Sequence, residues 1–231
     1  MILLSLLPLV ATCAAAAVMA LAVRRRGQMP VPLRWLLVVA LAASELVQLL
    51  WPAVTHTWSA ANTLPFQLSD IGTVVAIIGL LRSGDHAWRE LAFFWGVSSG
   101  VLGLAFPAIG ASAPSPLYFA FYVDHGTLLS VGILLATDPD LHLAWGSVLR
   151  SWAATTAVAV LAGLANLVTG GDYMFLRQPP GNWNPLLIMG PWPWYVLTAW
   201  AVCPLLFRLL ATPVWSDSGA PSPTRATHGS G

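Results

Sequence analysis

The stretch that decides the fold is Phe119-Ala-Phe-Tyr-Val-Asp124-His125-Gly126-Thr127, inside the apolar run 117–136. A run of this length and hydrophobicity is typical of a helix that crosses a bilayer. An acid and an imidazole at membrane depth are costly unless they have partners, so this pair indicates a polar site inside a helical bundle. A second run opens with Leu64-Pro65-Phe66-Gln67-Leu68-Ser69-Asp70, which brings an amide, a hydroxyl and a carboxyl group to membrane depth. We therefore expect the two stretches to share one site.

The composition excludes an ordinary soluble domain. Hydrophobic residues make up 57% of the 231 residues and charged residues 8%, whereas about 25% charged is usual. All ten basic residues are arginine, and the formal net charge of +1 offers no basic surface for nucleic acid. Cys13 and Cys203 lie in apolar runs without metal-ligand spacing, so we expect no metal and no cofactor. The predicted fold class is all-α, a polytopic membrane helical bundle.

Seven apolar runs predict about seven transmembrane helices within a single domain, residues 1–215, before a disordered cytoplasmic tail, residues 216–231. The runs cover residues 1–23, 33–53, 65–81, 88–107, 116–136, 148–169 and 190–211. The third is expected to begin at Pro65, because proline is common at the first helical position. The first run precedes Arg24-Arg25-Arg26, whereas a cleavable signal carries its positive charges before the apolar segment. We therefore expect a retained first span with its N-terminus outside.

The distribution of arginines agrees with this orientation. An outside N-terminus places nine arginines on the inner side and only Arg177 on the outer side, as the positive-inside rule requires. We expect a multi-pass protein of the cell membrane. The same topology brings polar residues of four spans into the outer half of the bilayer: Glu45, Gln48, Ser69, Asp70, His125 and Asn166. A cavity that opens outward explains this clustering, with the loop 170–189 as a lid.

The polar residues suggest catalytic roles and also have structural interpretations. His125 is the candidate general base, Ser69 the candidate nucleophile, and Asp70 or Asp124 the group that orients the imidazole. Alternatively, Asp124 and His125 form a hydrogen-bonded pair that joins helices, and the Ser69 hydroxyl bonds a backbone carbonyl. The candidate substrate-binding residues are Gln67, Glu45, Gln48, Asn166, Tyr173, Arg177, Trp192 and Trp194.

Five motifs occur in a characteristic order. They are Gln67-Leu-Ser-Asp70, Phe93-Phe94-Trp95-Gly96, Asp124-His125-Gly126, Gly171-Asp-Tyr-Met-Phe-Leu-Arg177 and Gly190-Pro-Trp-Pro-Trp-Tyr195. In this order they resemble the YwaF-like bacterial integral membrane proteins, a family similar in turn to eukaryotic transmembrane protein 164. The resemblance covers residues 33–210 and implies a phospholipid-remodelling acyltransferase that uses a cysteine and a histidine.

Carried over by motif, the family's cysteine falls on Ser69 and its histidine on His125. The sequence departs from the pattern at Ser69 and at Gln67, which stands where the family has histidine. A hydroxyl can replace a thiol as nucleophile, although it depends more strongly on its base. The resemblance therefore implies the helical architecture of the family. It implies the family's activity only if the Ser69 hydroxyl takes the place of the cysteine thiol as nucleophile.

The leading functional hypothesis is a lipid acyltransferase or acyl hydrolase with membrane lipids as its partners. A contrasting hypothesis is a proton-coupled carrier or channel, in which Glu45, Asp70, Asp124 and His125 form the path. A third is a non-catalytic membrane scaffold, in which these groups form bonds between helices. The sequence contains no nucleotide-binding loop that separates them, and it does not indicate protein partners.

The topology makes a testable prediction. A single cysteine placed in the 170–189 loop should react with a membrane-impermeant thiol reagent in intact cells, because this loop is expected outside. A cysteine near Arg82 should react only after the membrane is permeabilised. Labelling at both positions, or the reverse pattern, would overturn the outside N-terminus.

Overall fold

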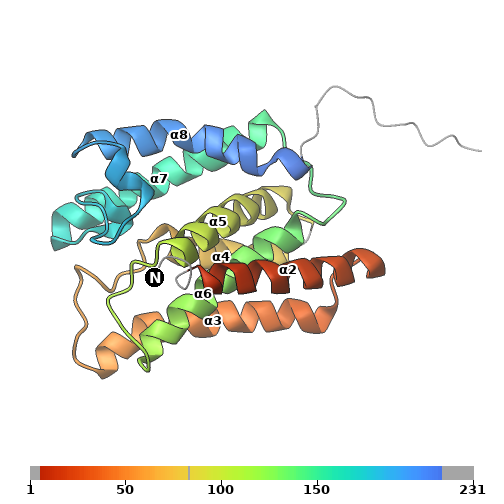
Figure 1. The fold of residues 1–231 in the computed structure, drawn as a ribbon, viewed down its shortest axis with the longest axis horizontal. Coiled ribbons are helices and arrows are strands. Elements are labelled where there is room, and N and C mark those ends of the chain that lie inside the picture. Colours follow the sequence, from red (N-terminus) through yellow and green to blue (C-terminus); the bar gives the residue numbers. More distant parts are fainter. Residues whose placement is uncertain (1–5, 83, 215–231) are drawn as a thin grey trace, which may run out of the picture.

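The computed structural model describes residues 6–82 and 84–214 (Figure 1). Within these residues the chain forms helices and no strands. The elements are α2 (Leu7–Arg26), α3 (Val31–Val54), α4 (Leu68–Leu81), α5 (His86–Ala105), α6 (Pro116–Leu135), α7 (Trp145–Thr169), η1 (Tyr173–Phe175), η2 (Pro185–Ile188), α8 (Trp194–Leu210) and η3 (Thr212–Val214). Each predicted span corresponds to one α-helix, which confirms the all-helical bundle. The predicted tail, residues 216–231, lies outside the described residues.

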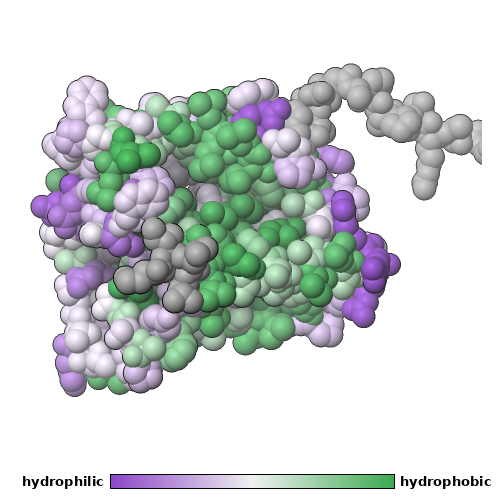
Figure 2. Space-filling view, viewed as in Figure 1, coloured by the Kyte–Doolittle hydropathy of each residue, from purple (hydrophilic) through white to green (hydrophobic). Residues whose placement is uncertain are grey.

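The helices differ in their ability to cross a membrane. α2, α3, α6 and α7 are long and apolar enough to do so, whereas α4 and α8 are shorter apolar helices. With 14 residues, α4 rises only about 21 Å at about 1.5 Å per residue, against a hydrocarbon core of about 30 Å. The number of spans and the outside N-terminus stay predictions. Figure 2 shows hydrophobic surface across the middle of the bundle and hydrophilic patches at both ends, as expected of a membrane bundle.

α6 is the central helix of the bundle. It packs against α2, α3, α4 and α5, and half of its most apolar window is buried, compared with 17–22% for the other three long apolar helices. Its contact with α5 is the most extensive in the fold. The residues 116–135 that opened the sequence argument therefore form the core of the structure.

Glycines allow α5 and α6 to approach closely. A Cβ built on Gly96 would lie 2.7 Å from the carbonyl oxygen of Leu128, and one built on Gly100 would lie 2.8 Å from the backbone nitrogen of Leu129. A Cβ on Gly103 would overlap the His125 imidazole. Small residues at these positions of α5 therefore allow the close contact between the two helices.

α7 and α8 form a hairpin that packs on α5, at the top of the view in Figure 1. The Trp95 indole donates to the Thr155 hydroxyl at 2.9 Å, and the rings of Phe94 and Phe207 stack at 4.8 Å. Near the start of α7, the buried Glu90 carboxylate accepts from Arg150, with a shortest distance of 2.8 Å. The hairpin is therefore joined to the core through α5.

The predicted starts of α4 and α8 lie before the first helical residues that the structure shows. α4 begins at Leu68 instead of Pro65, because Gln67 stays extended and its N–H donates to the Asp70 carboxylate at 2.9 Å. α8 begins at Trp194 instead of 190, immediately after Pro193, which occupies its N-cap. In both cases the polar or proline-rich start of the apolar run is a separate non-helical segment.

The α5–α6 contact generates a stability prediction. Gly100→Ala should lower the free energy of unfolding by about 1–3 kcal/mol, because its new methyl group meets the backbone of α6. Gly72→Ala is the matched control, since its Cβ would meet Trp95 at an ordinary 3.8 Å. Thermal unfolding of the detergent-purified protein measures both. Equal stability of the two variants would contradict the close-contact role of Gly100.

Candidate functional site

Asp124 is a buried carboxyl group that joins three helices. Its side chain is 1% exposed, and its Oδ1 accepts hydrogen bonds from Thr73 Oγ1 of α4 at 2.7 Å and Ser44 Oγ of α3 at 3.3 Å. Sequence reasoning missed both hydroxyl residues. The sequence did offer a signal for Thr73. It follows Asp70 by three residues and therefore lies on the same helix face as that predicted site residue.

His125 faces a different neighbour. Its Nδ1 lies 3.0 Å from the Phe121 carbonyl oxygen, and its ring stacks on the Phe121 ring at 4.1 Å between centroids. The other edge of the imidazole packs on Gly103 of α5. Nδ1 is also 3.7 Å from Asp124 Oδ2. The two side chains are therefore in contact, although Asp124 is bonded by α3 and α4 and His125 packs on α5.

Three carboxyl groups lie close enough to interact electrostatically. Asp70 and Asp124 both interact with Glu45, and Asp70 also interacts with Asp124. Among the described residues, Glu45 Oε2, Gln48 Nε2 and Asp124 Oδ2 are buried and have no hydrogen-bond partner. No group of residues in the described part of the chain has the geometry to hold a metal ion. The structure thus brings together the polar residues of the second, third and fifth predicted spans.

Ser69 lies at the edge of this cluster. It is half-buried in the first turn of α4, and its hydroxyl interacts with the Asp70 carboxyl group. In the described structure it makes no hydrogen bond to His125, whose Nδ1 is engaged by Phe121. The nearest carboxyl partner of the candidate nucleophile is therefore its own neighbour in sequence.

Residues 170–177 form a compact segment, here called the cap, over the N-terminus of α4. Asn166 anchors it from α7: Nδ2 donates to the Tyr173 carbonyl oxygen at 3.0 Å, and Oδ1 accepts from the Tyr173 N–H at 2.7 Å. Gln67 anchors it from α4, because its Oε1 accepts from the Met174 N–H at 2.8 Å. Two predicted site residues thus hold the cap in place.

The Tyr173 side chain fixes the cap to the segment before α4. Its hydroxyl donates to the Ala60 carbonyl oxygen at 2.8 Å and accepts from the Leu64 N–H at 2.9 Å. Burial raises the pKa of this phenol above its ordinary value, which keeps the donor protonated. Met174, with φ 57°, and Phe175, with φ 53°, adopt left-handed backbone conformations that these bonds stabilise.

Of the remaining predicted residues, Arg177 and Trp192 bond to the backbone at or next to the cap, whereas Trp194 does not. Arg177 Nη1 donates to the carbonyl oxygens of Gly170 and Gly171 at 2.9 and 3.3 Å, and so caps the C-terminus of α7. The Trp192 indole donates to the Leu176 carbonyl oxygen at 3.0 Å. Trp194, at 62% exposed, lies on the surface, and the structure does not bring it to the carboxyl cluster.

An apolar groove of about 560 Å³ runs along α7 beside the cap. Val160, Leu164 and Leu167 provide apolar lining, and Asn166, Arg177 and Trp192 lie at its polar end. Ser69 does not line this groove. The surface around the cap therefore combines an apolar channel with one exposed guanidinium group.

Comparison with known proteins gives one family. A family model described as the TMEM164 family matches residues 1–211. No curated protein and no solved structure matches the chain. The match spans the cap and the seven α-helices that the structure describes.

The cap makes its own prediction. Asn166→Ala removes both partners of the Tyr173 backbone, which should cost about 1–3 kcal/mol because these groups are buried. Hydrogen exchange in residues 170–177 should then accelerate by about tenfold or more. Asn182→Ala is the control, because its amide bonds the Pro107 carbonyl oxygen at an exposed position. Unchanged exchange in Asn166→Ala would show that the cap does not depend on this pair.

Proposed function

Because the chain belongs to the TMEM164 family of membrane proteins, we propose that it transfers or hydrolyses lipid acyl groups, with Ser69 as the nucleophile. The observation that carries the proposal is the position of Ser69, on the first turn of α4 and next in sequence to the Asp70 carboxyl group, which accepts a hydrogen bond from the Gln67 N–H. The motif resemblance supports it, since the family's catalytic cysteine corresponds to Ser69. The membrane position of the bundle makes membrane lipids the natural substrates.

The start of α4 supplies the features that acyl transfer requires. The first N–H groups of a helix have no partners within the helix, so they can stabilise the oxyanion of a tetrahedral intermediate. Asp70 Oδ2 is held by the Gln67 N–H at 2.9 Å, which fixes the carboxyl group beside Ser69. A hydroxyl needs such a base to become a nucleophile.

The proposed reaction has two steps. Ser69 Oγ attacks the acyl carbonyl carbon, its proton passes to the Asp70 carboxylate, and the lysolipid alkoxide leaves and takes that proton. A second lipid hydroxyl, or water, then attacks the acyl-serine ester and returns a proton to Ser69 Oγ through the same carboxyl group. His125 is the alternative base, and in that role its ring would have to turn away from Gly103 towards α4.

The groove along α7 suits a lipid substrate. Its apolar lining fits an acyl chain, and Arg177 at its polar end fits a phosphate group. The predicted outside N-terminus would place the groove in the outer leaflet of the cell membrane. These assignments of substrate position and leaflet are part of the proposal.

The carboxyl cluster favours a second candidate, a proton-coupled carrier. Glu45 Oε2 and Asp124 Oδ2 are buried without hydrogen-bond partners among the described residues. Intramembrane carboxyl groups of this kind are typical of proton pathways. A non-catalytic scaffold would instead use Asp124 only for its bonds to Ser44 and Thr73.

The enzyme hypothesis is tested in liposomes that contain an isotopically labelled phospholipid and an unlabelled lysolipid. Ser69→Ala should abolish acyl exchange and fatty-acid release, and Ser69→Cys should retain activity and become sensitive to thiol alkylation. Asp70→Asn should lower the rate by roughly 100- to 10,000-fold if Asp70 is the base, with His125→Gln affected far less. Mass spectrometry of both products gives the rates.

The controls separate the alternatives. Ser99→Ala removes a buried hydroxyl that has no hydrogen-bond partner within residues 6–82 and 84–214, so it should leave activity unchanged. Full activity in Ser69→Ala would exclude the covalent mechanism. A larger loss in His125→Gln than in Asp70→Asn would make His125 the base. Absence of acyl chemistry together with pH-driven uptake that requires Glu45 would favour the carrier.

A further inference from the structure

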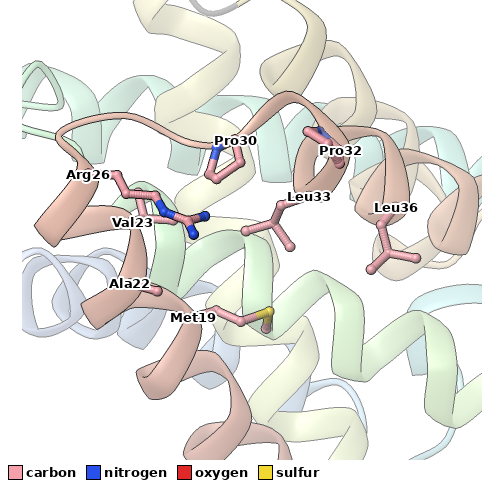
Figure 3. Close-up of a pocket in the computed structure, with 8 residues that line it drawn as sticks. All are labelled: Met19, Ala22, Val23, Arg26, Pro30, Pro32, Leu33 and Leu36. Carbon is pink, nitrogen blue, oxygen red and sulfur yellow. The ribbon is translucent and has the colours of Figure 1, made fainter.

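A cavity lies between α2 and α3 (Figure 3). The end of α2 that lines it is at the opposite end of the bundle from the cap (Figure 1). Its volume is about 380 Å³, within the range of about 300–1,000 Å³ usual for ligand pockets. The lining residues are Met19, Ala22, Val23, Arg26, Pro30, Pro32, Leu33 and Leu36. Seven of the eight are apolar, and the eighth is an arginine.

The cavity exists because the two helices do not pack closely on each other. A short connection joins them, which begins with Gly27 in a left-handed conformation at φ 74° and ends at Pro30. Both helices pack mainly on α6. Met19 and Leu33 are partly buried against the core, whereas Leu36 is exposed, and all three line the space between the helices. In a bilayer an acyl chain would fill this space.

One end of the cavity carries a concentration of positive charge. Figure 3 shows the Arg26 side chain extending from α2 across the cavity towards Leu33 of α3. Arg24 and Arg25 adjoin it at the end of α2, and Arg34 lies in the first turn of α3. Among the described residues, no Asp or Glu forms an ion pair with any of these four arginines. An anion is therefore the complementary partner.

We propose that this cavity binds an anionic phospholipid, with one acyl chain between α2 and α3 and the phosphate on the Arg26 guanidinium group. The apolar lining accounts for the chain, and the arginines account for selection of a negatively charged headgroup. The site is independent of the proposed acyl chemistry, because it lies at the opposite end of the bundle from Ser69. The bound lipid would act as part of the structure, closing the gap in the α2–α3 hairpin.

The proposal is tested by native mass spectrometry of the full-length protein in detergent, titrated with palmitoyl-oleoyl phosphatidylglycerol or with the phosphatidylcholine of the same chains. The wild type should bind one phosphatidylglycerol in preference to phosphatidylcholine. Arg26→Gln should weaken phosphatidylglycerol binding at least about tenfold, because it removes charge-assisted hydrogen bonds. Arg25→Gln, which does not line the cavity, should weaken it by at most about fivefold through general electrostatics.

A second pair of variants tests the acyl-chain position without changing any charge. Leu36 and Val39 are both exposed on α3, at 65% and 59%, and only Leu36 lines the cavity. Leu36→Trp should block phosphatidylglycerol binding, whereas Val39→Trp should leave it intact. Wild-type binding by Leu36→Trp, or equal losses in Arg26→Gln and Arg25→Gln, would overturn the site and leave only diffuse attraction of anionic lipid to the arginines.

Discussion

The structure depends on the burial of two adjacent polar side chains, Asp124 and His125, in the central helix. Adjacent positions on a helix point about 100° apart, so one neighbouring helix cannot satisfy both. α3 and α4 supply hydroxyl groups to Asp124, and α5 supplies the space at Gly103 for His125. The positions of α3, α4 and α5 around α6 meet these two requirements. The apolar residues of the bundle then pack around this arrangement.

The cap at the end of the bundle also depends on polar groups that receive hydrogen-bond partners from other segments. Non-helical backbone near membrane depth needs internal partners for its N–H and C=O groups. Asn166, Gln67 and the Tyr173 hydroxyl supply them from α7, from the start of α4 and from the cap itself. The residues that first suggested a substrate-binding lid thus have a defined structural role. A lid that opens would have to break these bonds together.

The two ends of the bundle differ in chemistry. The cap end holds Ser69 and the carboxyl groups of Glu45, Asp70 and Asp124. The end where α2 terminates holds an apolar gap beside arginines that form no ion pair with Asp or Glu among the described residues. The proposed reaction site and the proposed lipid site are therefore well separated. Each proposal can be tested without disturbing the residues of the other.

The sequence by itself determined the class of protein and the position of every helix to within a few residues. α6, for example, was expected over 116–136 and occupies Pro116–Leu135, because the length of an apolar run and its flanking prolines act locally. Only the tertiary structure decided which groups meet. Ser44 and Thr73 bind Asp124, and His125 turns to Gly103 instead of Ser69, because the helical repeat gives the direction of a side chain without the identity of the helix that faces it.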